Sequence, residues 1–191
     1  MSRVTIIIGH PDPSPERFCR ALSLAYENGA KETGHDVRIL DVAALGLPPL
    51  MNAAQWRTDP GPDITGAQTA IEWADHLVIV YPLWLGTMPA ALKAFFEQVM
   101  RPGFALSSGD SGYPKGLLKG RSARIVVTMG MPALAYRLFY RAHSLKSLER
   151  NILKFCGIGP VRESLVGMVE GSAASRSRWL AKMHRHGTKA S

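Results

Sequence analysis

The sequence predicts an α/β domain built on a parallel sheet. Short, continuously apolar runs of branched residues alternate along the chain with stretches that carry an apolar residue every three or four positions. Such runs are typical of parallel strands buried on both faces, and such stretches are typical of helices that cover a sheet. With 191 residues and 46% hydrophobic content, the chain is long enough for one well-filled domain.

Composition limits the class of protein. No apolar run approaches the roughly 20 residues of a membrane helix, and the run at residues 4–8 is too short for a signal peptide. We therefore expect a cytoplasmic protein without a membrane span. The two cysteines, Cys19 and Cys156, have no metal-like spacing, so no metal is expected. The net charge of +8 favours anionic partners, although a solvated basic surface is the better explanation of the charge alone.

The first strand is expected at residues 3–9, and it leads into a proline-rich loop at residues 9–17. Pro15 suits the first position of a helix, with Ser14 as its cap. The free N–H groups at the start of such a helix form a natural anion site, for which Ser14 and Arg17 are candidate phosphate ligands. Spacing alone favours the capping role for Ser14. The loop has neither the glycine pattern of a dinucleotide-binding loop nor that of a Walker loop.

The centre of the chain, residues 75–101, has the pattern of a strand, a loop and a helix. Residues 77–81 are uniformly apolar, and Pro82 ends the strand because it cannot donate to a sheet ladder. Pro89 suits the first turn of the helix that follows. The loop at residues 82–88 is therefore expected at the carboxyl end of a central strand, where open α/β sheets bind ligands.

The remaining apolar runs complete the predicted sheet. Further strands are expected at residues 35–40, 125–129 and 161–169, the last at an edge because it is less uniformly apolar. Residues 41–58 and 103–120 are expected to be irregular. Five strands joined by helices suit the flavodoxin-like order 2-1-3-4-5, with helices on both faces and a ligand at the switch between the first and third strands.

Several loop segments resemble a known family. Gly9-His-Pro-Asp-Pro, Tyr81-Pro-Leu-Trp, Met88-Pro-Ala-Ala-Leu-Lys and Thr128-Met-Gly resemble the flavodoxin-like NAD(P)H:quinone oxidoreductases, and the resemblance runs to about Val169. It implies a non-covalently bound flavin, FMN or FAD, with NAD(P)H as the electron donor. FMN is slightly favoured because the chain is short and nothing after Val169 looks like an added adenosine-binding segment. It also implies a small quinone-like acceptor and a homodimer with two active sites at its interface.

The resemblance assigns cofactor-binding roles to residues in three loops. On the phosphate side it implies His10, Phe18 and Cys19, in addition to Ser14 and Arg17. Around the flavin ring it implies two groups: Pro82, Leu83, Trp84 and Leu85, and Thr128, Met129, Gly130 and Met131. The sequence departs from the family at Cys19, where a polar Asn is usual, and at Leu85-Gly86, where an aromatic pair is usual. The second departure implies a less aromatic pocket.

Two residues after the second ring loop are the catalytic candidates. Tyr136 stands at the spacing of a family tyrosine near the flavin, and His143 lies one residue from a family histidine proposed to assist hydride transfer. The alternative for both is a half-buried basic helix. For His10 the alternative is a loop histidine bonded to its own backbone, and for Trp84 it is ordinary packing under a loop.

The last segment, residues 171–191, is basic and follows a flavodoxin-like domain at residues 1–170. Its spacing predicts an amphipathic helix that docks against the domain or a second subunit. The alternative is attraction of a nucleotide 2′-phosphate or an acidic surface. No basic strand is interleaved with aromatic residues, so no nucleic-acid partner is expected.

These observations predict a flavin-dependent NAD(P)H oxidoreductase that passes hydride through FMN or FAD to quinones or similar acceptors in a ping-pong cycle. The alternative is a flavin-binding ancillary subunit of a membrane cation-efflux transporter. A one-electron carrier is disfavoured by the basic charge, because such carriers usually present acidic docking faces.

Overall fold

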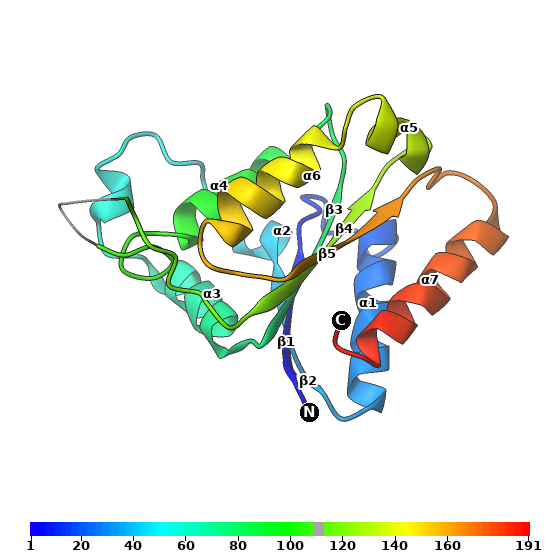
Figure 1. Ribbon diagram of the computed structural model, residues 1–191, viewed down its shortest axis with the longest axis horizontal. Helices are drawn as coiled ribbons and strands as arrows, with labels where there is room; N and C mark the ends of the chain where they lie inside the picture. The colour runs from blue at the N-terminus through cyan, green and yellow to red at the C-terminus, as the bar shows by residue number, and fades with distance from the viewer. Residues whose placement is uncertain (109–112) are drawn as a thin grey trace.

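The computed structural model describes residues 1–108 and 113–191, and a twisted parallel sheet forms its centre (Figure 1). The strands are β1 (Arg3–Ile8), β2 (Asp36–Asp41), β3 (His76–Pro82), β4 (Ser122–Thr128) and β5 (Val161–Val166). They form one 5-stranded sheet in the order β2-β1-β3-β4-β5, and all four pairings are parallel. The predicted fold and strand order are confirmed, and β5 lies at an edge as expected.

Helices cover both faces of the sheet (Figure 1). One face carries α1 (Phe18–Glu32) and α7 (Ala173–Gly187). The other carries α2 (Val42–Leu45), α3 (Pro62–Trp73), α4 (Ala90–Val99) and α6 (His143–Ser147), which continues into the π-helix η2 (Leu148–Lys154). The short helix α5 (Ala133–Leu138) follows β4 at the carboxyl edge of the sheet. In the described part of the chain, no helix is long and apolar enough to cross a membrane.

Successive side chains of β3 point to opposite faces of the sheet and so belong to different halves of the core. Leu77 and Ile79 pack in the cluster that contains α3 and α4, whereas Val78 and Val80 pack in the cluster that contains α1 and α7. All four side chains are buried. The strand reads as a continuous apolar run because both of its faces are covered.

The first helix begins later than the sequence predicts. α1 starts at Phe18 rather than at Pro15, and Ser14 caps no N–H group of the helix. Instead the carboxylate of Asp12 accepts the backbone N–H of Ser14 at 2.8 Å, which holds these residues in a turn. The expected capping role of Ser14 is therefore wrong, because an aspartate two residues earlier sets the local backbone.

Two further segments differ in detail. Residues 41–58 contain α2, which Asp41 caps by accepting the N–H of Ala43 at 3.1 Å, and the 3-10 turn Gln55–Arg57. The apolar stripe at residues 145–155 forms α6 and then η2 rather than one regular helix. Residues 109–112 of the expected long loop lie outside the described residues.

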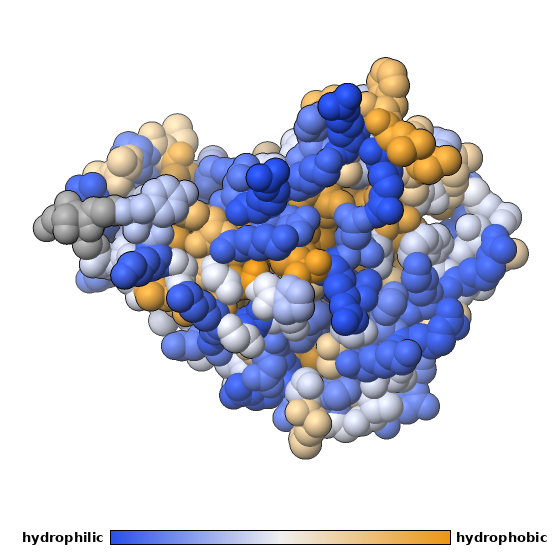
Figure 2. Space-filling view, viewed as in Figure 1, coloured by the Kyte–Doolittle hydropathy of each residue, from blue (hydrophilic) through white to orange (hydrophobic). Residues whose placement is uncertain are grey.

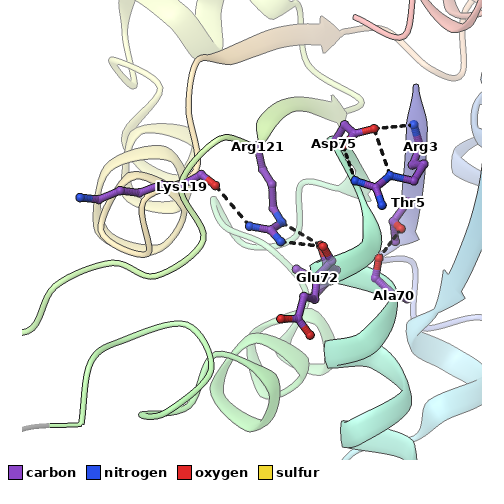
Figure 3. A network of polar contacts seen from close by, with 8 residues as sticks. Arg3, Thr5, Ala70, Glu72, Asp75, Lys119 and Arg121 are labelled. Carbon is purple, nitrogen blue, oxygen red and sulfur yellow. Dashed lines mark hydrogen bonds and ion pairs between the residues drawn. The ribbon is translucent and has the colours of Figure 1, made fainter. Parts of the chain in front are cut away.

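A polar network closes the sheet at the amino ends of the strands, away from the loops that the sequence singles out (Figure 3). The guanidinium of Arg3 donates to both carboxylate oxygens of Asp75, which comes just before β3. These bonds lower the pKa of Asp75 to about 2. From the start of β4, Arg121 donates to the carbonyl oxygens of Ile71 and Glu72 at the end of α3. The network fixes α3 against the sheet.

The last helix lies directly against the first. A Cβ atom added at Gly29 of α1 would collide with the carbonyl oxygen of His184, and one added at Gly187 of α7 would collide with that of Tyr26. The two backbones approach so closely only because neither glycine has a side chain. The basic C-terminal segment thus forms a helix that packs against α1.

Candidate functional site

Three loops meet at the carboxyl edge of the sheet. They follow β1, β3 and β4, and strand order alone places them side by side. The Gly9 N–H donates to the Val80 carbonyl oxygen at 2.8 Å, and the Leu83 N–H donates to that of Thr128 at 2.7 Å. A Cβ on Gly9 would lie 2.7 Å from a methyl carbon of Leu92 in α4, so a larger residue here would require the Leu92 side chain to move.

The loop after β1 is organised by Asp12. Its backbone N–H donates to Nδ1 of His10 at 3.1 Å, and its carboxylate accepts from the Ser14 N–H and from Nε of Arg17. Hydrogen bonding from Ser14, followed by that from Arg17, lowers the pKa of the Asp12 carboxyl. Arg17 is therefore held in place by an acid that sequence reasoning did not single out.

His10 is poised as a neutral donor. Burial lowers the pKa of its imidazole, and its side chain is only 8% exposed. Because Nδ1 accepts a backbone N–H, the proton of the neutral ring lies on Nε2. Its ring meets Trp84 edge-on, with 5.6 Å between the centroids, so the loops after β1 and β3 touch through two candidate residues. The histidine is thus bonded to its own loop, as the alternative interpretation held, and its Nε2–H makes no hydrogen bond to the part of the chain that the structure describes.

A second arginine supports this loop. Arg20, in the first turn of α1, donates to both carboxylate oxygens of Asp41 at 2.7 and 3.0 Å. It also reaches the carbonyl oxygen of Asp12 at 3.4 Å. Sequence reasoning missed Arg20. Its position three residues after Arg17, about one helical turn apart, is the signal that could have found it.

The start of α1 presents backbone donors toward the loop. Its N-cap residue, Arg17, makes no side-chain capping hydrogen bond. Phe18 and Cys19 open the helix, so their N–H groups have no partner within it. The side chain of Cys19 is buried, with Sγ 3.3 Å from Oγ1 of Thr128. Burial raises the pKa of this thiol to about 11. Cys19 therefore offers a backbone N–H rather than a reactive sulfur.

The loop after β3 carries an exposed apolar hairpin. Trp84 and Thr87 exchange two backbone hydrogen bonds of 2.9 Å, while Leu85 and Gly86 have φ angles of 46° and 78°. Two successive positive φ values are typical of a type I′ turn. Leu85 is fully exposed and Trp84 is 47% exposed. Trp84 is therefore half exposed while its ring contacts His10, so a role in flavin binding and ordinary loop packing both stay open. Pro82 ends β3 and is buried.

The loop after β4 combines buried side chains with open backbone. Met129 is buried and its N–H donates to the Val166 carbonyl oxygen, so its side chain belongs to the core. Gly130 is exposed, and a Cβ added there would meet no atom within 4 Å. Among the described residues, the N–H groups of Gly130 and Met131 make no hydrogen bond. The loop thus offers two adjacent donors beside open space.

The two catalytic candidates flank the turn between α5 and α6. The hydroxyl of Tyr136 is buried, lies 2.6 Å from Oγ of Ser144 and accepts the Leu145 N–H at 3.1 Å. It therefore already joins α5 to α6. His143 is exposed at the start of α6. The structure does not bring the two side chains into a mutual hydrogen bond, and their catalytic roles stay predictions.

Backbone strain gathers around the same edge. Non-glycine residues with positive φ include Leu85 after β3, Arg141 and Ala142 between α5 and α6, and Met168 after β5. The N–H of Met168 donates to the Met131 carbonyl oxygen, which ties this strained residue to the loop after β4. Such residues cost free energy and collect where function requires a fixed geometry.

The residues at this edge fit a flavin. A phosphate at the start of α1 would meet uncapped N–H groups and the Nε2–H of His10, in the field of Arg17 and Arg20. A flat ring could lie in the open space at Gly130, near the exposed Trp84. Reduced flavin carries negative charge on one edge, which the N–H groups of Gly130 and Met131 can stabilise.

Comparison with known proteins agrees with this geometry. Residues 2–186 match the Flavodoxin_2 family, described as having a flavodoxin-like fold. The chain belongs to this family. An uncharacterized NAD(P)H oxidoreductase of Haemophilus influenzae is 30% identical over 167 residues, which cover 85% of this chain and 82% of that protein.

Two other similar proteins extend the comparison. An FMN-dependent NADH:quinone oxidoreductase of Colwellia psychrerythraea is 31% identical over 113 residues, 59% of this chain and 54% of that protein. The crystal structure of Smu.1420 from Streptococcus mutans superposes with a TM-score of 0.82 at 27% identity, over 98% of this chain and 99% of that one. These comparisons establish the family and the fold.

Proposed function

We propose that the protein is a flavin-dependent NAD(P)H oxidoreductase that reduces quinones or similar acceptors. The observation that carries the proposal is the convergence of two sets of backbone donors on the same carboxyl edge, at the start of α1 and at residues 130–131, which have no partner among the described residues. One set suits a phosphate and the other suits the polar edge of a ring. The names of the Haemophilus and Colwellia relatives support the same activity.

Each loop has a distinct task in this proposal. The uncapped N–H groups of α1, with His10 and Arg17, hold the phosphate end, while Trp84 packs against the ring and Gly130 lets the backbone approach it. The bound flavin supplies two-electron transfer between NAD(P)H and the acceptor. Tyr136 or His143 stabilises the charge that develops on the reduced ring, an effect of roughly tenfold to a thousandfold on rate.

FMN is preferred to FAD. The α7 segment packs along α1 through Gly29 and Gly187, so it is committed to the domain rather than to an adenosine moiety. The Colwellia relative is named for FMN. The absorption spectrum of the purified protein and the mass of the released cofactor test this proposal. Purified protein that neither carries nor takes up a flavin would refute it.

A ping-pong cycle follows from a single slot above the ring. A slot that holds one flat ring at a time requires the oxidised nicotinamide to leave before the acceptor enters. Steady-state rates with NAD(P)H and a simple benzoquinone should therefore give parallel double-reciprocal lines. Intersecting lines would show that donor and acceptor occupy separate places.

A further inference from the structure

The outer surface of α7 is strongly basic. Among residues 173–191 there are five arginines and lysines and no acidic residue. Four of them are exposed and lie three or four residues apart, three on α7 and the last in the turn that follows it. We call them the basic stripe: Arg178, Lys182, Arg185 and Lys189. Figure 2 shows this region as a continuous hydrophilic band.

The charge of the basic stripe is not cancelled locally. None of its four residues takes part in an ion pair within the described part of the chain. Acidic side chains on the neighbouring elements are engaged by other groups, Glu163 by Arg137 and Glu32 by His184. Lys182 lies over the ring of Trp179, with Nζ 4.5 Å from the centroid, which holds one ammonium group at the surface.

The basic stripe is also held rigidly. The opposite side of α7 packs on α1 through Gly29 and Gly187, and Met183 is buried between the two helices. The apolar side of α7 is therefore not free to enter a bilayer by itself, as it would be in an isolated amphipathic helix. Any apolar contact with a partner must come from a neighbouring element.

α5 supplies that apolar contact. Leu134 and Leu138 are 66% and 67% exposed and lie one turn apart on the helix. A hollow of about 320 Å³ lies between α5 and α7 and is lined by Leu134, Arg137, Trp179 and Lys182, so the two helices are neighbours. Figure 2 shows apolar residues protruding at the edge of the molecule in the region where Figure 1 places α5.

We propose that α7 and the exposed leucines of α5 form a surface that docks on an anionic lipid bilayer. The basic stripe faces the headgroups, where each arginine or lysine is attracted by the negative surface potential. Leu134 and Leu138 enter the boundary between headgroups and acyl chains. A nucleic acid would engage the basic stripe but would leave both leucines in water, and this pairing of apolar and basic groups therefore favours lipid.

The docked orientation has a consequence for the site. α5 begins at Ala133, directly after the loop that carries Gly130, so the docked surface would adjoin the carboxyl edge of the sheet. A lipophilic acceptor dissolved in the membrane would then have a short path to the site. This consequence rests on the proposed function, whereas the docking itself does not.

Co-sedimentation with vesicles tests the docking without any measurement of activity. The protein should pellet with vesicles of equal parts phosphatidylglycerol and phosphatidylcholine, and not with vesicles of phosphatidylcholine alone. Binding should weaken sharply between about 0.1 M and about 1 M salt, as screening shortens the reach of the charges. No binding to the anionic vesicles, or equal binding to both kinds, would overturn the proposal.

Matched variants locate the surface. Changing all four residues of the basic stripe to glutamine should lower the vesicle partition coefficient by far more than tenfold, because the loss of each positive charge weakens binding roughly fivefold. The control changes four exposed basic residues elsewhere and leaves the same net charge: Arg57→Gln, Lys115→Gln, Lys119→Gln and Lys146→Gln. Equal losses in both variants would mean that net charge alone drives binding, and would refute a specific surface.

A further pair of measurements separates lipid from other polyanions. The double variant Leu134→Ser and Leu138→Ser should lose several-fold in vesicle binding and nothing in binding to duplex DNA, measured at the same salt. If the wild-type protein binds duplex DNA more tightly than vesicles of equal phosphate concentration, the partner of this surface is a nucleic acid and not a membrane. Thermal melting of each variant confirms that the fold is retained.

Discussion

At the scale of single residues, substitutions at Gly130 and Trp84 can distinguish a role in flavin binding from a role in folding. Gly130 has open space where a side chain would stand, and Trp84 is half exposed. We expect Gly130→Val and Trp84→Ala to weaken flavin binding by tenfold or more while each changes the free energy of unfolding by less than about 1 kcal/mol. Flavin titration followed by fluorescence, beside thermal melting of the apoprotein, measures both quantities.

A glycine outside the site provides the control for this prediction. Gly66 lies in α3 and belongs to none of the three loops, and a Cβ atom added there would also meet no atom within 4 Å. Gly66→Val should leave flavin affinity unchanged. If Gly130→Val and Trp84→Ala keep full affinity but melt at lower temperature, both residues serve the fold alone.

At the scale of elements, the contact between α1 and α7 depends on two glycines. A methyl group at Gly29 or Gly187 would strike backbone carbonyl oxygens, which cannot turn aside as a flexible side chain can. We expect Gly29→Ala and Gly187→Ala each to lower the free energy of unfolding by about 1–3 kcal/mol. Denaturant unfolding measures this loss.

The double variant sharpens the test. Once one alanine has separated the helices, the second should cost less, so the two losses should not add. Gly66→Ala, in an open helical position, is the control and should raise stability by up to about 1 kcal/mol. Additive losses, or none, would show that the helices adjust without strain.

The elements were largely predictable from sequence, and the reasons are local. Continuously apolar runs such as residues 77–81 mark the strands of a doubly covered sheet, and Pro82 and Pro89 bound the loop between β3 and α4. The start of α1 was not predictable in the same way. A proline and a serine favour an earlier start, whereas in the fold the Ser14 N–H donates to the carboxylate of Asp12 and holds these residues in a turn.

The site was predicted less completely than the fold. Sequence reasoning found the three loops, because each follows a predicted strand. It missed Asp12 and Arg20, whose roles depend on ion pairs with residues that fold near them. It also gave no sign that the hydroxyl of Tyr136 is bonded to Ser144 and Leu145, since that contact exists only after α5 and α6 meet.

At the scale of the whole molecule, buried histidines link stability to pH. Burial, reinforced by Arg124, lowers the pKa of both His76 and His186 to about 4. In the unfolded chain their pKa returns to about 6.5. The unfolded state therefore binds more protons between these values, and stability is full above about pH 6.5 and falls as the pH drops toward 4.

Urea unfolding at pH 7 and pH 5 checks this expectation. The free energy of unfolding should fall by up to about 1.4 kcal/mol per pH unit for His76, and by less for His186, which is more open to solvent. His76→Gln keeps a polar partner for Ser122 and should flatten the slope. A flat profile in the wild type would contradict the linkage.

An exposed aromatic pair directly after α5 bears on how the whole molecule assembles. A single domain leaves the outer face of a ring bound at the carboxyl edge open to water. Phe139 is 81% exposed and Tyr140 is 49% exposed, and their rings meet edge-on with 5.0 Å between the centroids. Exposed aromatic pairs of this kind are typical anchors of an interface. We therefore expect a homodimer in which this pair helps to cover the partner's site.

The double variant Phe139→Ser and Tyr140→Ser should dissociate the dimer, because it removes the apolar area that two copies would bury. Quinone reduction should fall at least about tenfold, since water then reaches the ring, while the free energy of unfolding at low protein concentration should change little because both side chains are exposed. Light scattering and steady-state rates measure the two effects. The control is Leu24→Ser. Leu24 is an apolar residue of α1 that is 55% exposed, and its loss should alter neither the dimer nor the rate of quinone reduction. A wild-type protein that is a fully active monomer would show that one chain completes the site alone.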